Sequence, residues 1–228
     1  MKRFVQILLV VLFPFFVLLA WVRIMLFPVF VQVEYQRAGF PPDPYGFTTR
    51  ERIHWAEVSA AYLLSAEGPD YFSQFTLPGG SPLYNEREAK HMADVHDLVQ
   101  KGMVLLGILA GAYLLGGAFL FWKDRTALWK TLSLAGKAGL ALLLTVLVVV
   151  ALAWNWAFVA FHEVFFTGGT WMFPYSDTLI RLFPETFWQD GFASAVIGML
   201  ATCLLVWFAS AKIPSWIARH GRPSAPKS

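Results

Sequence analysis

Four long apolar stretches divide the chain, and each is long enough to cross a membrane as a helix. A bilayer core of about 30 Å needs roughly 20 apolar residues in helical form. The expected transmembrane helices are residues 1–27, 98–122, 132–158 and 191–211. The remaining segments are 28–97 and 159–190, a short loop at 123–131 and a tail at 212–228. This pattern predicts an all-α membrane protein with four transmembrane helices.

The first apolar stretch begins Met-Lys-Arg, as a secretory signal peptide does. Its apolar part is longer than that of a signal peptide, and no small-residue cleavage site follows it. We therefore expect an uncleaved signal-anchor helix.

Composition supports the membrane assignment. Hydrophobic residues make up 57% of the chain and charged residues only 14%, whereas soluble domains carry about 25% charged residues. No basic run of the kind that binds nucleic acid is present, nor is a glycine-rich phosphate loop. The single cysteine, Cys203, excludes a disulfide within the chain, and we expect it to pack in an apolar helix.

The basic residues indicate the orientation of the chain in the membrane. Short cytoplasmic loops are enriched in lysine and arginine. Such residues precede the first stretch, fill the loop at 123–131 and follow the fourth stretch. Both termini are therefore expected in the cytoplasm, with segments 28–97 and 159–190 outside. Of the fifteen acidic residues, all but Asp124 then lie outside.

The first outer segment, 28–97, is long enough to form a small cap. Thr48 and Glu51 have capping-box spacing, and Gly68 is a plausible helix end, which predicts a helix of about 17 residues. Pro78-Gly79-Gly80 predicts a tight turn or short hairpin. The cap is thus expected to hold a helix plus short turn or hairpin elements.

A second helix start is expected at Asn85, with Glu88 three residues later. Nothing interrupts the pattern before Trp122, so this helix should run from the cap straight into the second span.

The other outer segment, 159–190, is densely aromatic. Gly168-Gly169 and two prolines favour an irregular loop with one short helix beginning near Ser176. Arg181 is expected to pair with Asp177 or Glu185. Aromatic residues at the membrane interface commonly form a belt.

The polar run at 83–98 allows three interpretations. It can be a solvated helix end, whose acidic residues suit the helix N-terminus. It can hold a metal, with Glu88, His91 and Asp94 joined by His162. Alternatively, His91 and His162 are general acid and base at the membrane surface. On a straight helix His91 stands roughly 10–18 Å above the hydrocarbon, so the two histidines meet only if that helix tilts or the second outer segment rises.

Two long motifs resemble one known family. The stretches "YNEREAKHMADVHDL" and "FHEVFFTGGTWMFPYSDTLIRLFPETFW", with "FPPDPYGFTTRER" at the cap entry, resemble the integral membrane family of the bacterial lipoprotein intramolecular transacylase. The resemblance implies transfer of the sn-2 acyl chain of a diacylglyceryl group to the α-amino group of the N-terminal cysteine, giving a lyso-form lipoprotein. It implies that His91 and His162 are the catalytic pair.

The implied reaction needs no acyl-enzyme, because amine and ester belong to one substrate. This agrees with the absence of a Gly-x-Ser-x-Gly nucleophile motif. No cofactor or metal is expected. Glu88, Asp94 and Glu163 are candidates to orient a histidine. Asn85, at the expected start of the helix that carries Glu88 and Asp94, is a further supporting residue. The expected substrate pocket comprises Tyr84, Phe165, Phe166, Trp171, Arg181 and Trp188.

The expected partners are diacylglyceryl-modified bacterial lipoproteins and the lipid bilayer, with no nucleic acid. The expected place is the bacterial plasma membrane, with the active site on its extracytoplasmic face. Two alternatives stay open. One is a metal-dependent membrane hydrolase using Glu88, His91 and His162, and the other is a non-enzymatic lipoprotein-binding scaffold.

Overall fold

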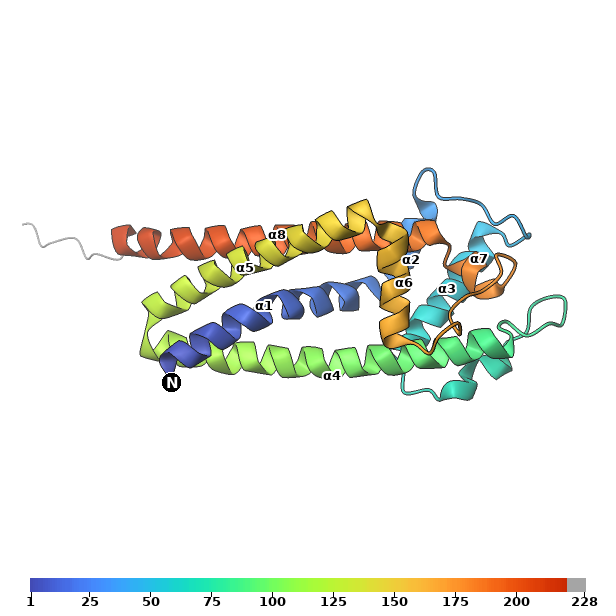
Figure 1. The fold of residues 1–228 in the computed structure, drawn as a ribbon, viewed down its shortest axis with the longest axis horizontal. Helices are drawn as coiled ribbons and strands as arrows, with labels where there is room; N and C mark the ends of the chain where they lie inside the picture. Colours follow the sequence, from blue (N-terminus) through green and yellow to red (C-terminus); the bar gives the residue numbers. More distant parts are fainter. Residues whose placement is uncertain (221–228) are drawn as a thin grey trace, which may run out of the picture. The chain divides into compact units, whose positions relative to one another are not determined.

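The computed structural model describes the backbone of residues 1–220 and the side chains of residues 1–212. Within that range the chain forms helices and loops, without a β-strand (Figure 1). The helical elements are α1 (Lys2–Met25), α2 (Pro28–Gln36), α3 (Thr49–Leu63), η1 (Pro69–Gln74), α4 (Glu86–Lys123), α5 (Arg125–Leu152), α6 (Trp154–Phe165), α7 (Thr178–Leu182) and α8 (Glu185–His220).

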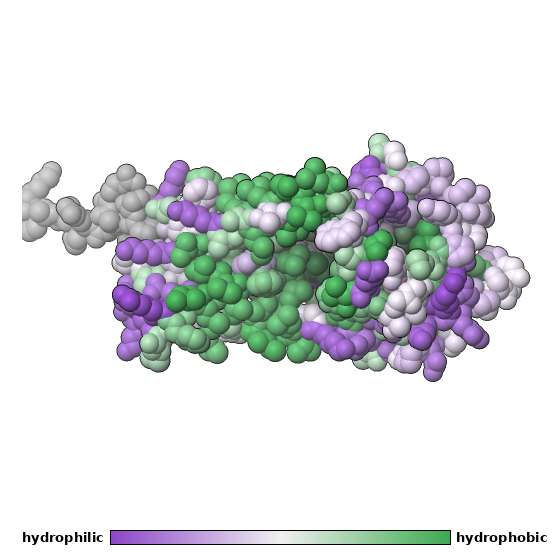
Figure 2. Space-filling model, viewed as in Figure 1, coloured by the Kyte–Doolittle hydropathy of each residue, from purple (hydrophilic) through white to green (hydrophobic). Residues whose placement is uncertain are grey.

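Four of these helices, α1, α4, α5 and α8, are long and apolar enough to cross a membrane. Figure 2 shows hydrophobic residues over their exposed faces, with hydrophilic residues gathered near the start of α1 and the connection from α4 to α5. The predicted all-α fold of a multi-pass membrane protein is confirmed.

The chain separates into two compact units. The bundle unit contains residues 1–20, 106–148 and 196 onward, and the cap unit contains residues 21–105 and 149–195.

In the bundle unit, helices approach closely at small residues. A Cβ added to Gly136 would lie 2.8 Å from the carbonyl oxygen of Cys203, and one added to Gly139 would lie 2.7 Å from the Cys203 sulfur. Such small residues let transmembrane backbones come together. The Cys203 side chain is fully buried, as its apolar surroundings predicted. The Tyr113 hydroxyl donates to the Leu9 carbonyl oxygen.

The cap unit has the larger hydrophobic core. Its buried apolar side chains come from α2, α3, η1, the residues just before α4, the first turns of α4, α7 and the start of α8. They include Tyr35, Tyr62, Phe72, Leu83, Tyr84, Leu182 and Phe187. Aromatic rings dominate this core, and several meet edge to face. The cap is therefore a packed structure rather than a set of loops.

The predicted local signals of the first outer segment are confirmed. Thr48 and Glu51 form the capping box at the start of α3, although the helix ends at Leu63, two residues short of the expected length. Thr76 and Pro82 make an isolated antiparallel bridge. Gly80, with φ +82°, occupies the left-handed conformation that the turn between them requires.

The start of α4 also follows the prediction. The Asn85 N–H donates to Glu88 Oε2 at 2.8 Å, and the Glu88 N–H donates to Asn85 Oδ1 at 3.0 Å. From there α4 continues without a break to Lys123. At a rise of 1.5 Å per residue it is much longer than the bilayer core, so its first dozen residues precede the expected span 98–122.

One prediction about helix continuity is wrong. The stretch 132–158 is not a single helix, because α5 ends at Leu152 and α6 begins at Trp154. Ala153 leaves the helical region with φ −148° and ψ 52°. The Trp154 ring packs near Phe192, and its Nε1 donates to Glu185 at 3.1 Å. These contacts with α8 hold the new direction, and neither glycine nor proline marks it in the sequence.

The second outer segment is more helical than expected. It contains most of α6, and the expected short helix is α7, which begins at Thr178, two residues after Ser176. The final helix, α8, already starts at Glu185.

Candidate functional site

The structure brings His91 and His162 together within the cap unit. His91 lies in the second turn of α4 and His162 in the last turn of α6. Their ring centroids are 6.4 Å apart, with an angle of 22° between the planes. In Figure 1, α6 runs across the direction of α4. The break at Ala153 makes α6 a separate helix within the cap unit, where its last turn places His162 beside His91.

Aromatic rings enclose the pair. Phe166 and Phe173 lie 4.9 and 5.4 Å from the His91 ring. Phe158 and Trp171 lie 4.2 and 4.6 Å from the His162 ring. A surrounding of this kind lowers the local polarity and disfavours charge on the imidazoles.

His91 is buried, with 7% of its surface exposed, and its Nδ1 has no hydrogen-bond partner among the described residues. Its position precedes the expected span 98–122. Burial, and then the neighbouring His162, lowers the pKa of His91 to about 4. The ring is therefore neutral at physiological pH, with one nitrogen left for a substrate.

His162 is half-buried and held by the backbone. Its Nδ1 lies 2.7 Å from the carbonyl oxygen of Phe158, one helical turn earlier. A carbonyl oxygen only accepts, so Nδ1 carries the proton and Nε2 keeps its lone pair. Burial lowers the pKa of His162, although the bond to Phe158 raises it. A neutral imidazole with a free Nε2 is suited to accept a proton.

Trp171 supplies a second unpartnered polar atom beside the pair. Its Nε1 is buried and has no hydrogen-bond partner within the described chain, while its ring packs on His162. An indole N–H is only a donor, and buried donors are seldom left unsatisfied. The position suits an oxygen atom of a bound ligand.

Glu88 is fully buried but does not touch either histidine ring through a hydrogen bond. Its Oε2 accepts from the Asn85 N–H and its Oε1 accepts from the Leu179 N–H at 2.7 Å. Burial raises the pKa of Glu88, and the two backbone donors oppose that rise. Glu88 therefore joins the start of α4 to the start of α7.

The other predicted orienting carboxylates make no hydrogen bond in the described structure. Asp94 is half-buried and Glu163 is exposed. No group of three or more metal-ligating side chains converges among the described residues, and both oxygens of Glu88 are engaged by backbone N–H groups. The proposed metal set of Glu88, His91, Asp94 and His162 therefore does not assemble here.

Of the predicted pocket residues, Phe166 and Trp171 lie against the histidine pair. Phe165 is exposed and packs on Phe161. Tyr84 belongs to the cap core, where its hydroxyl lies 2.7 Å from Ser59 Oγ. The Trp188 Nε1 donates to the Phe183 carbonyl oxygen at 3.2 Å.

Arg181 has a different partner from the one predicted. It pairs with Asp43 at 2.9 Å and lies 3.8 Å over the Phe47 ring, whereas Asp177 pairs with Arg87 at 3.2 Å. Sequence proximity suggested the wrong partner because the loop before α3 folds against α7. Arg52, which is buried, reinforces that contact by donating to the Arg181 carbonyl oxygen at 3.0 Å.

Sequence reasoning missed Phe158 and Phe173 as neighbours of the pair. Phe158 is four residues before His162 and one helical turn away, so helical spacing could have found it. Phe173 carried no such signal.

An open hollow of about 560 Å³ lies between the first turns of α4 and the loop after α6 that leads to Trp171. It is lined by Glu86, Arg87, Lys90, Gly168, Gly169 and Thr170.

Comparisons with known proteins show which family the chain belongs to. A family model described as "Lipoprotein intramolecular transacylase Lit" matches residues 7–188. An uncharacterized protein of Aquifex aeolicus is 31% identical over 208 residues, which cover 91% of this chain and 94% of that protein.

Solved structures with a similar fold include the membrane integral lipoprotein intramolecular transacylase Lit from Bacillus cereus. A variant with one histidine replaced by arginine has a TM-score of 0.74 and 17% identity, over 97% of this chain and 95% of that one. Another structure of the same protein has a TM-score of 0.70 and 16% identity, over 98% of this chain and 99% of that one.

Proposed function

Because this chain belongs to the lipoprotein intramolecular transacylase (Lit) family, we propose that it moves the sn-2 acyl chain of a diacylglyceryl-modified lipoprotein to the α-amino group of that lipoprotein's N-terminal cysteine. The product is a lyso-form lipoprotein. The observation that carries this proposal is the pair of neutral histidines, His91 and His162, in an aromatic enclosure.

The chemistry is a balanced exchange within one substrate molecule. The neutral amine nitrogen forms a bond to the ester carbon, and the bond from that carbon to the glycerol oxygen breaks. One proton leaves the nitrogen and one proton joins the glycerol oxygen. The pair of histidines ends each turnover unchanged, and no acyl-enzyme is required.

We assign proton abstraction to His162. Its Nδ1–H donates to the Phe158 carbonyl oxygen, which leaves Nε2 as the acceptor. His91, whose Nδ1 has no partner among the described residues, is assigned to hydrogen bonding at the departing glycerol oxygen. The pair delivers to that oxygen the proton taken from the amine. General acid–base catalysis of this kind contributes roughly 10²–10⁴-fold to a rate.

Trp171 is assigned to the ester carbonyl oxygen, which becomes negatively charged in the tetrahedral intermediate. A fixed N–H donor in a site of low polarity stabilises such an oxyanion. The surrounding Phe158, Phe166 and Phe173 rings would accommodate lipid and exclude water that would otherwise hydrolyse the ester. Holding amine and ester together supplies much of the remaining acceleration.

The proposed place of the reaction is the extracytoplasmic face of the bacterial plasma membrane, with both termini in the cytoplasm. The distribution of lysine and arginine along the chain supports this orientation.

The test is mass spectrometry of a lipoprotein's N-terminal peptide from cells that lack N-terminal acylation activity. Cells expressing the wild type should yield an N-acyl, monoacylglyceryl cysteine whose total mass equals that of the diacylglyceryl form. His91→Ala and His162→Ala should leave the substrate unchanged. Fragmentation distinguishes the two isomers because only the product retains an acyl chain on nitrogen.

His54→Ala is the matched control, because His54 is an exposed histidine of α3 in the same cap unit and should leave activity intact. If the wild type and both alanine variants, all present as folded protein, leave the diacylglyceryl form untouched, the proposed substrate is wrong. If either histidine variant retains full activity, the catalytic pair is wrong.

A further inference from the structure

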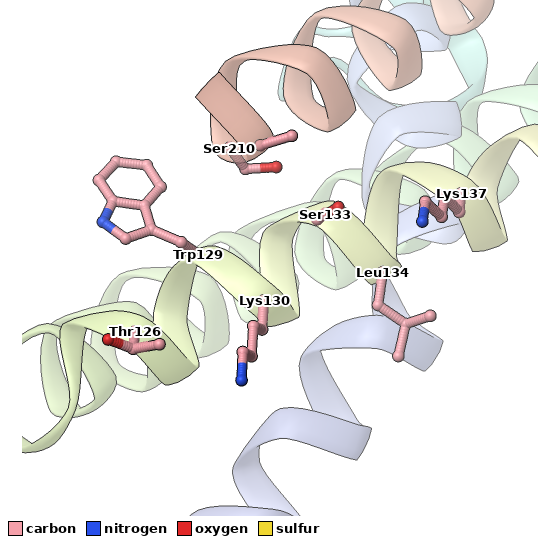
Figure 3. Close-up of a pocket in the computed structure, with 8 residues that line it drawn as sticks. Thr126, Trp129, Lys130, Ser133, Leu134, Lys137 and Ser210 are labelled. Atoms are coloured by element: carbon pink, nitrogen blue, oxygen red, sulfur yellow. The ribbon is translucent and has the colours of Figure 1, made fainter. Parts of the chain in front are cut away.

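The bundle unit contains an open hollow that the proposed reaction does not use. Its volume is about 450 Å³, and α5 and α8 line it. Figure 3 shows Ser210 on α8 facing the stretch of α5 that carries Ser133, with Trp129 and Lys137 to either side of Ser133 along α5 and the Lys130 side chain extending from the side of α5 away from Ser210. The histidine pair belongs to the other unit.

Two lysines give the hollow a positive charge. Lys130 and Lys137 are seven residues apart on α5, so they lie on nearly the same face and about 10.5 Å apart along the axis. Both are exposed, and neither has a carboxylate within ion-pair distance among the described residues. The Lys137 ammonium lies 5.4 Å from the Trp207 ring centroid.

The bundle unit lacks acidic residues that could neutralise these lysines. The segments 1–20, 106–148 and 196–228 carry ten lysines and arginines but a single acidic residue, Asp124. Asp124 is paired with Lys2 at 2.9 Å. A lysine within an apolar helix is costly unless it reaches the interface or an anion. An anion from outside the chain can therefore bind in the hollow without competition from a carboxylate of the bundle unit.

The remaining lining matches the parts of a phospholipid. The Ser133 and Thr126 hydroxyls can donate to phosphate oxygens, and neither side chain makes a hydrogen bond within the described residues. Tryptophan is favoured at the level of lipid headgroups, which suits Trp129. Leu134 gives the hollow an apolar edge against which an acyl chain can pack.

We propose that this hollow binds the phosphate group of an anionic phospholipid from the cytoplasmic leaflet. Lys130 and Lys137 supply the charge, and Ser133 supplies a hydroxyl donor. Basic pockets between transmembrane helices on the cytoplasmic side commonly take such headgroups. The site is separate from the proposed reaction and does not depend on it.

The test is native mass spectrometry of the full chain in detergent, titrated with phosphatidylglycerol or with phosphatidylcholine of the same acyl chains. The wild type should retain phosphatidylglycerol preferentially. Lys130→Gln and Lys137→Gln should each weaken that retention about fivefold, whereas Lys137→Arg, which keeps the charge, should retain it. Lys123→Gln removes a positive charge that is close to Lys130 in the sequence but does not line the hollow. It should have little effect on the retention of phosphatidylglycerol.

Equal retention of the two lipids by the wild type would overturn the proposal. An equal loss in Lys123→Gln would also overturn it, since net charge rather than the hollow would then hold the lipid. A parallel titration with inorganic phosphate distinguishes the source. If inorganic phosphate displaces no bound phosphatidylglycerol and binds no better than chloride, the lipid is the ligand. Tight binding of free phosphate by a protein that does not retain phosphatidylglycerol would overturn the lipid assignment.

Discussion

The catalytic proposal at the scale of residues depends on two imidazoles that stay neutral. Both pKa values are lowered by burial, that of His91 to about 4. Each histidine is therefore neutral above its lowered pKa, and in the proposed mechanism it stops accepting protons only as the pH falls through that value. The substrate's α-amino group, by contrast, has an ordinary pKa of about 7.7–8.0 and must also be neutral to attack.

We therefore predict that kcat/KM falls about sevenfold between pH 7.5 and pH 6.5, because the amine alone titrates in that range. The slope should steepen only below pH 6.5, the ordinary histidine value. Purified enzyme with a synthetic diacylglyceryl lipopeptide, analysed by mass spectrometry, gives this profile. A slope of about 1.5 already at pH 6.5 would mean that a histidine titrates at its ordinary pKa and would contradict the burial argument.

The residues near the histidine pair show which parts of the site could be predicted from the sequence. The pair itself, with Phe166 and Trp171, was predicted from motifs and is brought together by the fold. Tyr84, Trp188 and Arg181 were also expected in the pocket, but their polar atoms bind partners that are remote in the sequence or part of the backbone. Such contacts depend on packing between segments, which residue spacing along one segment does not encode.

At the scale of elements, Glu88 joins two helices. One oxygen closes the capping box at the start of α4, and the other accepts from the Leu179 N–H at the start of α7. The capping box was predictable because its two residues are three apart. The bond to Leu179 was not, because 91 residues separate the partners. The short α7 follows the loop that carries Trp171 and Phe173, so Glu88 helps to position that loop.

We predict that Glu88→Ala destabilises the protein by roughly 2–4 kcal/mol, because it removes a cap and leaves a buried N–H without a partner. For a chain of this size that corresponds to a fall in the apparent Tm of about 5–15 °C. Thermal unfolding in detergent, followed by intrinsic fluorescence, measures it. Glu86→Ala is the control, since Glu86 is exposed in the same turn of α4 and should lower the Tm by only a few degrees. Equal effects of the two substitutions would show that only the helix dipole matters.

The break between α5 and α6 shows a limit of prediction at this scale. Hydropathy indicated one stretch from 132 to 158 because tryptophan, alanine and phenylalanine continue the apolar run through the turn. The sequence "ALAWNWAF" contains no glycine or proline. Contacts of Trp154 with Phe192 and Glu185 on α8 set the new direction. The proximity of His91 and His162 therefore depends on a feature that only the assembled cap reveals.

At the scale of the whole molecule, charge and chemistry are divided along the sequence. The bundle unit carries ten basic residues and one acidic residue, whereas the histidine pair and the other fourteen acidic residues belong to the cap unit. The proposed place of the reaction is the extracytoplasmic face, which requires the cap unit on that side. The abundance of lysine and arginine in the bundle unit independently supports the orientation that we propose.

We predict that a single cysteine at position 81 is reachable from outside the cell, and one at position 126 is not. Ser81 is exposed in the turn of the cap, and Thr126 is exposed just after the connection from α4 to α5. Each substitution, Ser81→Cys or Thr126→Cys, is made with Cys203→Ala, which removes the only native thiol. In intact spheroplasts a charged maleimide should label the first variant alone, and after permeabilisation it should label both. The opposite pattern would place the histidine pair in the cytoplasm, away from the proposed substrate, and would overturn both the orientation and the assignment of the lysine-lined hollow to the cytoplasmic leaflet.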